Sequence, residues 1–95
     1  MSAKTFTLEE AQQAIHAQLI TLCEGLGEDA SDLGLDESIP GSGLVDSAAL
    51  LELLAWYESH FGIELAPAEI TIDNLGSVAL MARYALARQA TAASR

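Results

Sequence analysis

The sequence predicts an all-α fold, a small bundle of three long helices and a short third one, with a long loop between the first two. Apolar residues recur every three or four positions in three separate stretches, which is the period of an amphipathic helix. Residues 63–72 alternate weakly, but no second strand pattern exists to pair with them. A chain of 95 residues, 51% of them hydrophobic, can bury one core, so we expect a single domain over residues 1–95.

The first predicted helix begins at Leu8 and ends near Gly27. Thr7 can cap the first turn while Glu10, three residues later, reciprocates in a capping box. At about 100° per residue the apolar positions keep to one stripe, which we expect to be buried. The members of this stripe are Leu8, Ala11, Ile15, Leu19, Leu22 and Leu26.

A long loop is predicted for residues 27–43, which hold four of the seven glycines and Pro40 without a sustained hydrophobic period. A connection of this length tends to be functional, or to be tethered by a few buried side chains. The candidate tethers are Leu33, Leu35 and Ile39.

The second predicted helix covers residues 48–61, follows Asp46-Ser47 and stops at Gly62. We expect its buried stripe to contain Leu50, Leu54, Tyr57 and Phe61, widened by Leu51 and Leu53. The opposite face should meet solvent or a partner, and it contains Ala48, Glu52, Ala55 and Ser59, with Trp56 at its edge.

The rest of the chain predicts a short turn of helix at residues 67–70 and a last helix over residues 77–89. The last helix would bury Val78, Met81, Ala82 and Ala85, and the small side chains could leave an acyl cleft or allow close helix packing. The core therefore spans about residues 8–89. Residues 90–95 form a small polar tail that we expect to fray.

The net charge of −10 narrows the possible functions. All fourteen acids and no Lys or Arg lie within residues 5–82, because the four basic residues are Lys4, Arg83, Arg88 and Arg95. Such a chain repels nucleic acid and anionic membranes. The anionic surface serves either solubility or docking to partners with basic patches.

Cysteine and hydropathy patterns indicate a cytoplasmic protein without a membrane segment. Cys23 is the only cysteine, so no disulfide can form within the chain. The first ten residues lack the apolar core of a signal peptide, and no stretch approaches the roughly 20 apolar residues that span a bilayer.

Enzyme and metal motifs fail on inspection, so we expect neither catalysis nor a metal site. His16, Cys23 and His60 are scattered, whereas zinc usually takes at least three clustered ligands. Residues 29–40 are not a calcium loop, because Leu33 occupies a ligand position and Pro40 replaces the bidentate Glu. The glycines at residues 41–43 lack the lysine of a phosphate-binding loop.

The role of Ser47 depends on the residues around it. It is not placed as a catalytic nucleophile, because Val45 and Ala49 stand where a nucleophile elbow requires glycines. Asp46 can cap the helix that Ser47 enters, an arrangement found at many helix starts. The longer string around them, GLVDSAALLELLAWYESHFGIEL over residues 43–65, distinguishes this serine from an ordinary helix start.

Over residues 8–85 the chain resembles the family of free-standing acyl carrier proteins. The resemblance depends on register, with Asp46-Ser47 at the helix start, Glu52 five residues after the serine, and Phe61-Gly62-Ile63 fourteen to sixteen residues after it. It implies an acyl-carrier bundle in which Ser47 receives 4'-phosphopantetheine and Asp46 shapes the turn. The arm would carry acyl or aminoacyl groups as thioesters, and the chain itself would not be an enzyme.

The resemblance also implies partners: a phosphopantetheinyl transferase, an acyl- or aminoacyl-loading ligase, and downstream acyl-transfer or tailoring enzymes. The expected contact residues are Ala48, Glu52, Ala55, Trp56 and Glu58, on a monomer. Ala48 and Ala55 stand where the family commonly has bulkier apolar residues, which favours a specialised polyketide, nonribosomal peptide or envelope-type pathway. Trp56 either anchors a partner or packs on the loop of residues 27–43.

A second hypothesis remains open at this point. An acidic helical bundle of this size could serve as an unmodified adaptor that binds a basic protein and never carries a prosthetic group.

Overall fold

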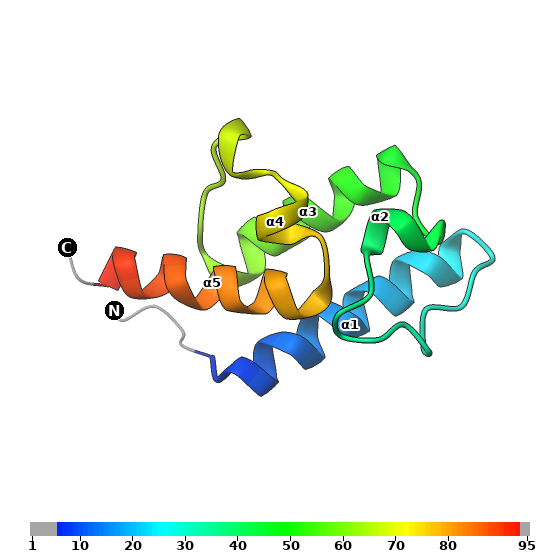
Figure 1. The fold of residues 1–95 in the computed structure, drawn as a ribbon, viewed down its shortest axis with the longest axis horizontal. Helices are drawn as coiled ribbons and strands as arrows, with labels where there is room; N and C mark the ends of the chain where they lie inside the picture. The colour runs from blue at the N-terminus through cyan, green and yellow to red at the C-terminus, as the bar shows by residue number, and fades with distance from the viewer. Residues whose placement is uncertain (1–5, 94–95) are drawn as a thin grey trace.

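The computed structural model describes residues 6–93, and the side chains of residues 6–90 (Figure 1). The elements in order are α1 (Leu8–Gly25), α2 (Ile39–Ser42), α3 (Ser47–Phe61), a 3-10 turn (Pro67–Glu69), α4 (Ile72–Leu75) and α5 (Val78–Ala93). The described part of the chain contains no strand, which confirms the all-α class and the exclusion of a strand at residues 63–72.

Helix α1 begins at Leu8 as predicted, and both halves of the capping box form. The backbone N–H of Glu10 donates to Thr7 Oγ1 over 3.1 Å, and the N–H of Thr7 donates to Glu10 Oε1 over 2.9 Å. The ends of the predicted stripe were wrong, since Leu8 is 39% and Leu26 45% exposed. Leu26 is the C-cap, where the backbone leaves the helix, and the buried position near this end belongs to Cys23.

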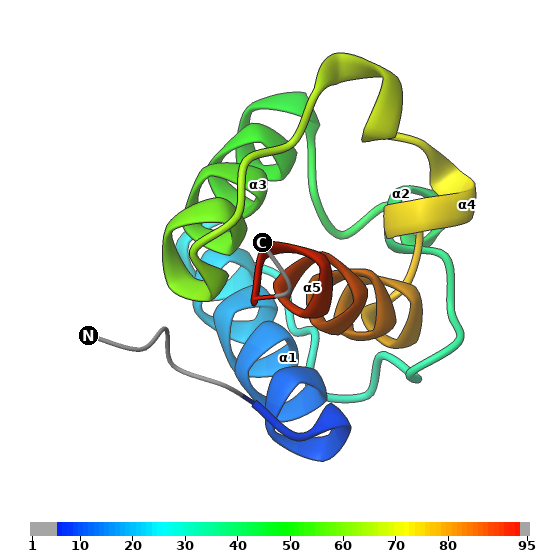
Figure 2. The same cartoon turned by 90° about the vertical axis from the view of Figure 1, so that its left-hand side faces the viewer.

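The core lies where α5 meets the other helices. Helix α5 packs against α1 and α4, while α1 also packs against α3, and Figure 2 shows α5 end-on with α1, α3 and α4 around it. The fully buried side chains include Ile15, Leu19, Leu53, Val78 and Met81. Burial of these large apolar side chains is the main force that holds the helices together.

One buried hydrogen bond joins α3 to α5 inside this core. The side chain of Tyr57 is 0% exposed, and its hydroxyl donates to the carbonyl oxygen of Met81 over 2.7 Å. The hydroxyl is thus satisfied without water, as a buried polar group requires. Burial raises the pKa of Tyr57 far above its ordinary value.

The loop prediction for residues 27–43 was partly wrong, because α2 forms within it. Ser38 Oγ accepts a hydrogen bond from the N–H of Gly41 over 3.0 Å, and Pro40 lies in the first turn. Both features favour a helix start, but four residues are too short to show a hydrophobic period.

The loop is tethered by backbone as well as by side chains. Leu33 and Ile39 are buried as predicted, whereas Leu35 is 44% exposed, so its side chain is not a tether. The carbonyl of Leu35 instead accepts from the N–H of Ala79 over 2.9 Å, and the N–H of Ile39 donates to the carbonyl of Gly76 over 2.7 Å.

The second half of the chain differs from the predictions at three points. Leu51 was expected in the buried stripe of α3 but is 68% exposed. Helix α4 was not predicted, because its four residues follow a 3-10 turn without a period of their own. Helix α5 runs to Ala93, four residues beyond its predicted end at residue 89. This extension is rich in alanine, the strongest helix former; residues 94–95 lie outside the described part.

Among residues 6–93, no helix combines the length and the apolar character needed to cross a bilayer.

Candidate functional site

The N-terminal end of α3 presents Ser47 to solvent. Asp46 caps this helix as predicted, with its Oδ1 accepting from the N–H of Ala49 over 2.8 Å. The carbonyl of Asp46 accepts from the N–H of Leu50 over 2.9 Å. Ser47 is therefore the first helical residue, and it is exposed. Its position is set by a capped helix and not by a loose loop.

The chain that leads into α3 is held from α2. Ser42 Oγ donates to the carbonyl of Ile39 over 2.7 Å and accepts from the N–H of Leu44 over 3.2 Å. Gly43 adopts the left-handed conformation, with φ of 75°, which most other residues would reach only with strain. This turn aims the backbone so that residues 46 and 47 emerge at the surface.

The environment of Ser47 fits a phosphodiester. Within residues 6–93 its hydroxyl makes no hydrogen bond, so it is available for attachment. The N-terminus of a 15-residue helix offers free backbone N–H groups and the positive end of the helix dipole, both of which favour an attached phosphate. The residues present can therefore hold a phosphopantetheine arm.

A groove lies directly beside Ser47, between the C-terminal end of α1 and the first two turns of α3. Its volume is about 260 Å³. The lining residues are Thr21, Leu22, Gly25, Leu26, Asp46, Ala48, Ala49 and Glu52. Asp46 and Ala48 flank Ser47 in the sequence, so the groove reaches the serine on this side of the helix.

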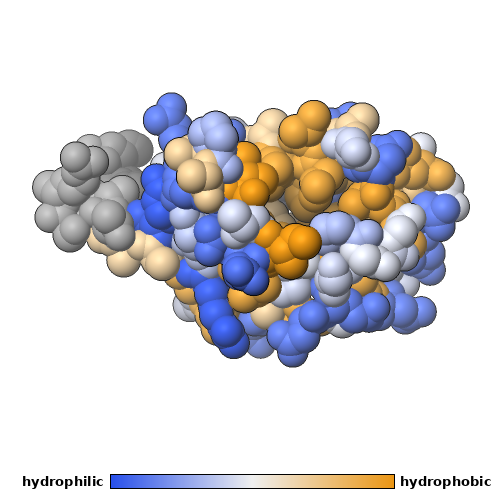
Figure 3. Space-filling view, turned by 45° about the horizontal axis from the view of Figure 1, so that its top comes forward, coloured by the Kyte–Doolittle hydropathy of each residue, from blue (hydrophilic) through white to orange (hydrophobic). Residues whose placement is uncertain are grey.

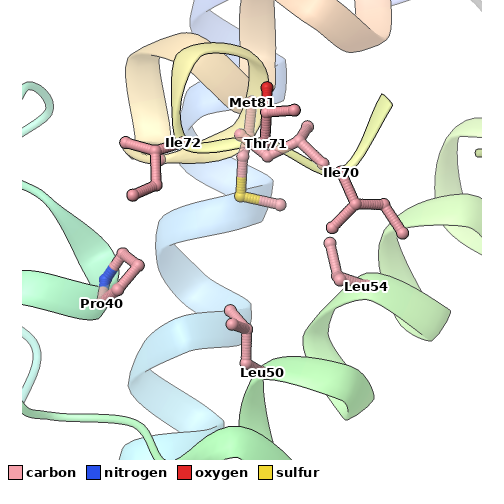
Figure 4. Close-up of a pocket in the computed structure, with 9 residues that line it drawn as sticks. Pro40, Leu50, Leu54, Ile70, Thr71, Ile72 and Met81 are labelled. Carbon is pink, nitrogen blue, oxygen red and sulfur yellow. The ribbon is translucent and has the colours of Figure 1, made fainter. Parts of the chain in front are cut away.

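An apolar pocket opens on the other side of α3 (Figure 4). It measures about 130 Å³ and is lined by Pro40, Leu50, Leu54, Ile70, Thr71, Ile72, Leu75, Gly76 and Met81. In Figure 3 apolar side chains gather around a hollow on the face turned forward. Of the two alternatives for Ala82 and Ala85, an acyl cleft or close helix packing, the structure supports packing, because both side chains are fully buried and Met81 supplies the α5 wall of this pocket.

The carboxylate of Glu69, next to Ile70 in the lining of the pocket, binds to side chains of α5. Glu69 Oε2 accepts hydrogen bonds from the hydroxyl of Tyr84 and from Arg88 Nη1, and Glu69 Oε1 accepts from the N–H of Ala66 over 2.8 Å. The hydrogen bond from Tyr84 and that from the backbone of Ala66 hold the pKa of Glu69 below its ordinary value. Tyr84 thus packs against the core and also hydrogen-bonds to Glu69.

The predicted contact residues of α3 differ in exposure. Ala48, Glu52 and Ala55 are exposed on the side of α3 that also presents Ser47. Glu58 is half-buried, and its Oε2 accepts a hydrogen bond from the N–H of Leu65 over 2.7 Å, which holds the chain after α3.

Trp56 belongs to an aromatic cluster near the C-terminal end of α3. Its ring stacks on His60, with centroids 4.7 Å apart and an interplanar angle of 16°, and meets Phe61 edge-on at 6.0 Å. The ring of Phe6 lies 4.9 Å from that of Phe61. Trp56 is half-buried in this cluster, and its role as a partner anchor stays a prediction.

Sequence reasoning missed one apolar residue of the exposed face, Leu51. It follows Ser47 by four residues, follows Ala48 by three and precedes Ala55 by four, and residues at these spacings are neighbours on a helix surface. This spacing was the signal in the sequence that placed Leu51 on the same exposed face. Ile72 on α4 is similarly exposed, at 67%.

The single thiol of the chain is not placed for chemistry. Cys23 is buried, and its Sγ lies 3.8 Å from the carbonyl oxygen of Leu44. Burial, with the charges of Glu28 and Asp29, raises the pKa of Cys23, which disfavours the reactive thiolate. In the described residues no three His, Cys, Asp or Glu side chains gather as a metal site would require.

Comparison with known families gives one match. The model of the family described as "phosphopantetheine attachment site" matches residues 19–85, from the middle of α1 into α5, which includes Ser47. No curated protein and no solved structure matches the chain. Together with the all-α fold, this match confirms the resemblance to acyl carrier proteins. The chain belongs to the phosphopantetheine attachment site family, whose members bear a covalently attached 4'-phosphopantetheine, and it is a carrier protein.

Proposed function

We propose that Ser47 is the residue to which a phosphopantetheinyl transferase attaches the arm, and that the chain then delivers acyl or aminoacyl intermediates to partner enzymes. The observation that carries the proposal is the exposed hydroxyl of Ser47 at the capped N-terminus of α3. Once attached, the arm supplies a thiol on which a load is held as a thioester.

The attachment step uses coenzyme A as donor. The hydroxyl oxygen of Ser47 attacks the phosphorus that bears the pantetheine, and the bond from this phosphorus to adenosine 3',5'-bisphosphate breaks. A base of the transferase takes the hydroxyl proton. Asp46, the carboxylate next to Ser47 in the sequence, caps the helix instead, and its Oδ1 accepts from the N–H of Ala49. The chain acts as the substrate of this step, and its contribution is to present the hydroxyl of Ser47 to the transferase in a fixed, exposed position.

The apolar pocket supports an apolar acyl load over a charged aminoacyl one. Leu50 and Leu54, one and two turns after Ser47, form one wall of it, and no charged side chain lines it. A carbon chain entering this pocket loses its contact with water, whereas an ammonium group would lose hydration without a partner. We expect a load short enough for about 130 Å³.

The small exposed residues Ala48 and Ala55 support a specialised pathway of the polyketide, nonribosomal peptide or envelope type. The partners are then the transferase, a loading ligase and downstream acyl-transfer or tailoring enzymes, which meet a monomeric carrier in the cytoplasm. Contacts of this kind must form and release quickly. A charged and salt-sensitive surface suits them better than a broad apolar one.

The proposal is tested by incubating the chain with coenzyme A, magnesium and a broad-specificity phosphopantetheinyl transferase. One addition of about 340 Da is expected, and fragmentation should place it on Ser47. Ser47→Ala should gain no mass. Ser59→Ala, which removes another exposed α3 serine, is the matched control and should be modified like the parent chain.

The adaptor remains the second candidate, supported by the net charge of −10. It requires a chain that works with a bare Ser47. If several transferases add no mass to the folded chain, the adaptor is favoured and the carrier role of Ser47 is refuted.

A further inference from the structure

We propose that the groove between α1 and α3 is a docking surface for the phosphopantetheinyl transferase, which inserts an apolar side chain there from a basic surface. This inference rests on the proposed role of Ser47. It adds the C-terminal end of α1, and Leu26 in particular, to a contact that sequence reasoning confined to α3.

The position of the groove makes it accessible to an enzyme that works on Ser47. On α3 the serine stands between two hollows, the apolar pocket beside Leu50 and Leu54 and the groove beside Ala48 and Ala49. Because Asp46 and Ala48 line the groove on either side of Ser47 in the sequence, a protein that reaches the serine from the α1 side covers the groove. Figure 1 shows the C-terminal end of α1 and the N-terminal end of α3 at the same end of the molecule.

The wall of the groove combines apolar surface with an exposed leucine. Leu22 is half-buried, Ala49 is buried, and Leu26 stands at the rim with 45% of its surface exposed. An exposed leucine at the C-cap of α1 contributes little to the core of the free carrier. Covering it with a partner removes this apolar surface from water.

The charges around the groove indicate the chemistry of the partner. Glu52 and Asp46 line it, and the last turn of α1 contains Glu24 and no basic residue. Acidic groups at a helix C-terminus face the negative end of the dipole, which is an unfavourable arrangement in the free protein. Lysine or arginine side chains of a partner relieve this repulsion, and the attraction speeds encounter.

The test compares two exposed leucines at opposite ends of α1. Leu26→Ser removes the apolar rim, while Leu8→Ser, at 39% exposure, removes a similar side chain about 27 Å away along the helix. With coenzyme A saturating and the concentration of the carrier varied, Leu26→Ser should lower the transferase kcat/KM about fivefold. This is the change in affinity expected when about half of a leucine side chain is no longer buried by the partner. The loss should be in KM, with kcat unchanged.

Leu8→Ser should leave kcat/KM unchanged, and Leu26→Met, which keeps an apolar side chain, should restore most of the lost rate. Urea denaturation of each variant shows whether it remains folded. Equal rates for Leu26→Ser and the parent chain overturn the inference and leave the role of Ser47 intact. An equal loss in Leu8→Ser overturns it too, as does a concentration-dependent dimer that Leu26→Ser dissociates. A parent chain that gains no arm refutes both the inference and the proposed function.

Discussion

The hydrogen bond between α3 and α5 provides the sharpest test of the fold. Tyr57→Phe removes one hydroxyl from a side chain that is 0% exposed and leaves the ring in place. The carbonyl of Met81 lies inside α5 and keeps its intrahelical hydrogen bond, so no buried oxygen is left wholly unpaired. The free energy of unfolding should therefore fall by about 1 kcal/mol, the net worth of a typical intramolecular hydrogen bond.

Urea denaturation followed by the fluorescence of Trp56 measures this change. With a slope of about 1 kcal/mol/M for a small domain, the midpoint should fall by about 1 M with the slope unchanged. Tyr84→Phe is the control, since water can replace its partly exposed hydroxyl on Glu69 and its midpoint should move less. An unchanged midpoint for Tyr57→Phe, or a larger shift for Tyr84→Phe, refutes the stabilising role of the hydrogen bond between Tyr57 and Met81.

Three further predictions concern the ends of α3 and the cluster on α5. Asp46→Ala should lower the free energy of unfolding by about 1 kcal/mol through loss of the cap, while Asp46→Asn keeps most of it, as urea midpoints would show. Gly62→Ala should cost about 1–2 kcal/mol in the same assay, because this residue ends α3 at a φ of 67°. The lowered pKa of Glu69 stabilises the fold above its ordinary value of 4.5, and this stabilisation is lost as the pH falls through the lowered pKa. In acid titrations followed by circular dichroism, Glu69→Gln should unfold with a shallower dependence on pH.

The sequence predicted the long helices well because their signals are local. The capping box at Thr7 and the cap at Asp46 depend on side chains three residues apart, and both form as expected. The stripe through Ile15 and Leu19 is long enough to define a period.

The wrong predictions concern features that depend on tertiary contacts. Leu51 follows Leu50 in an apolar run, and only the placement of the segments around α3 determines that Leu50 is half-buried and Leu51 exposed. Helices α2 and α4 have four residues each, too few for a hydrophobic period, and they are held by contacts with distant segments.

The candidate site was predictable in part. Asp46 and Ser47 were singled out from their register with the rest of the helix, and the structure shows Asp46 as the cap of α3 and Ser47 exposed at its start. The groove and the pocket were not predictable, since each joins residues from helices far apart in the sequence. The hydrogen bond between Glu58 and the backbone of Leu65 was not predictable either, because nothing in the sequence distinguishes such a glutamate from one that contacts a partner.

The two backbone hydrogen bonds between the loop and the start of α5 bear on how such a chain can vary. Because Leu35 is joined to Ala79 through main-chain atoms, its exposed side chain can be exchanged without breaking the link, whereas Ile39, joined to Gly76 in the same way, is also held by its buried side chain. The spacing is less tolerant, since a single insertion between Leu35 and Ile39 puts one of the two bonds out of register. Pro40, which follows directly, would then leave its place opposite Ile72. Chain length at this junction thus determines whether the loop keeps both backbone hydrogen bonds and whether Pro40 keeps its place in the lining of the apolar pocket.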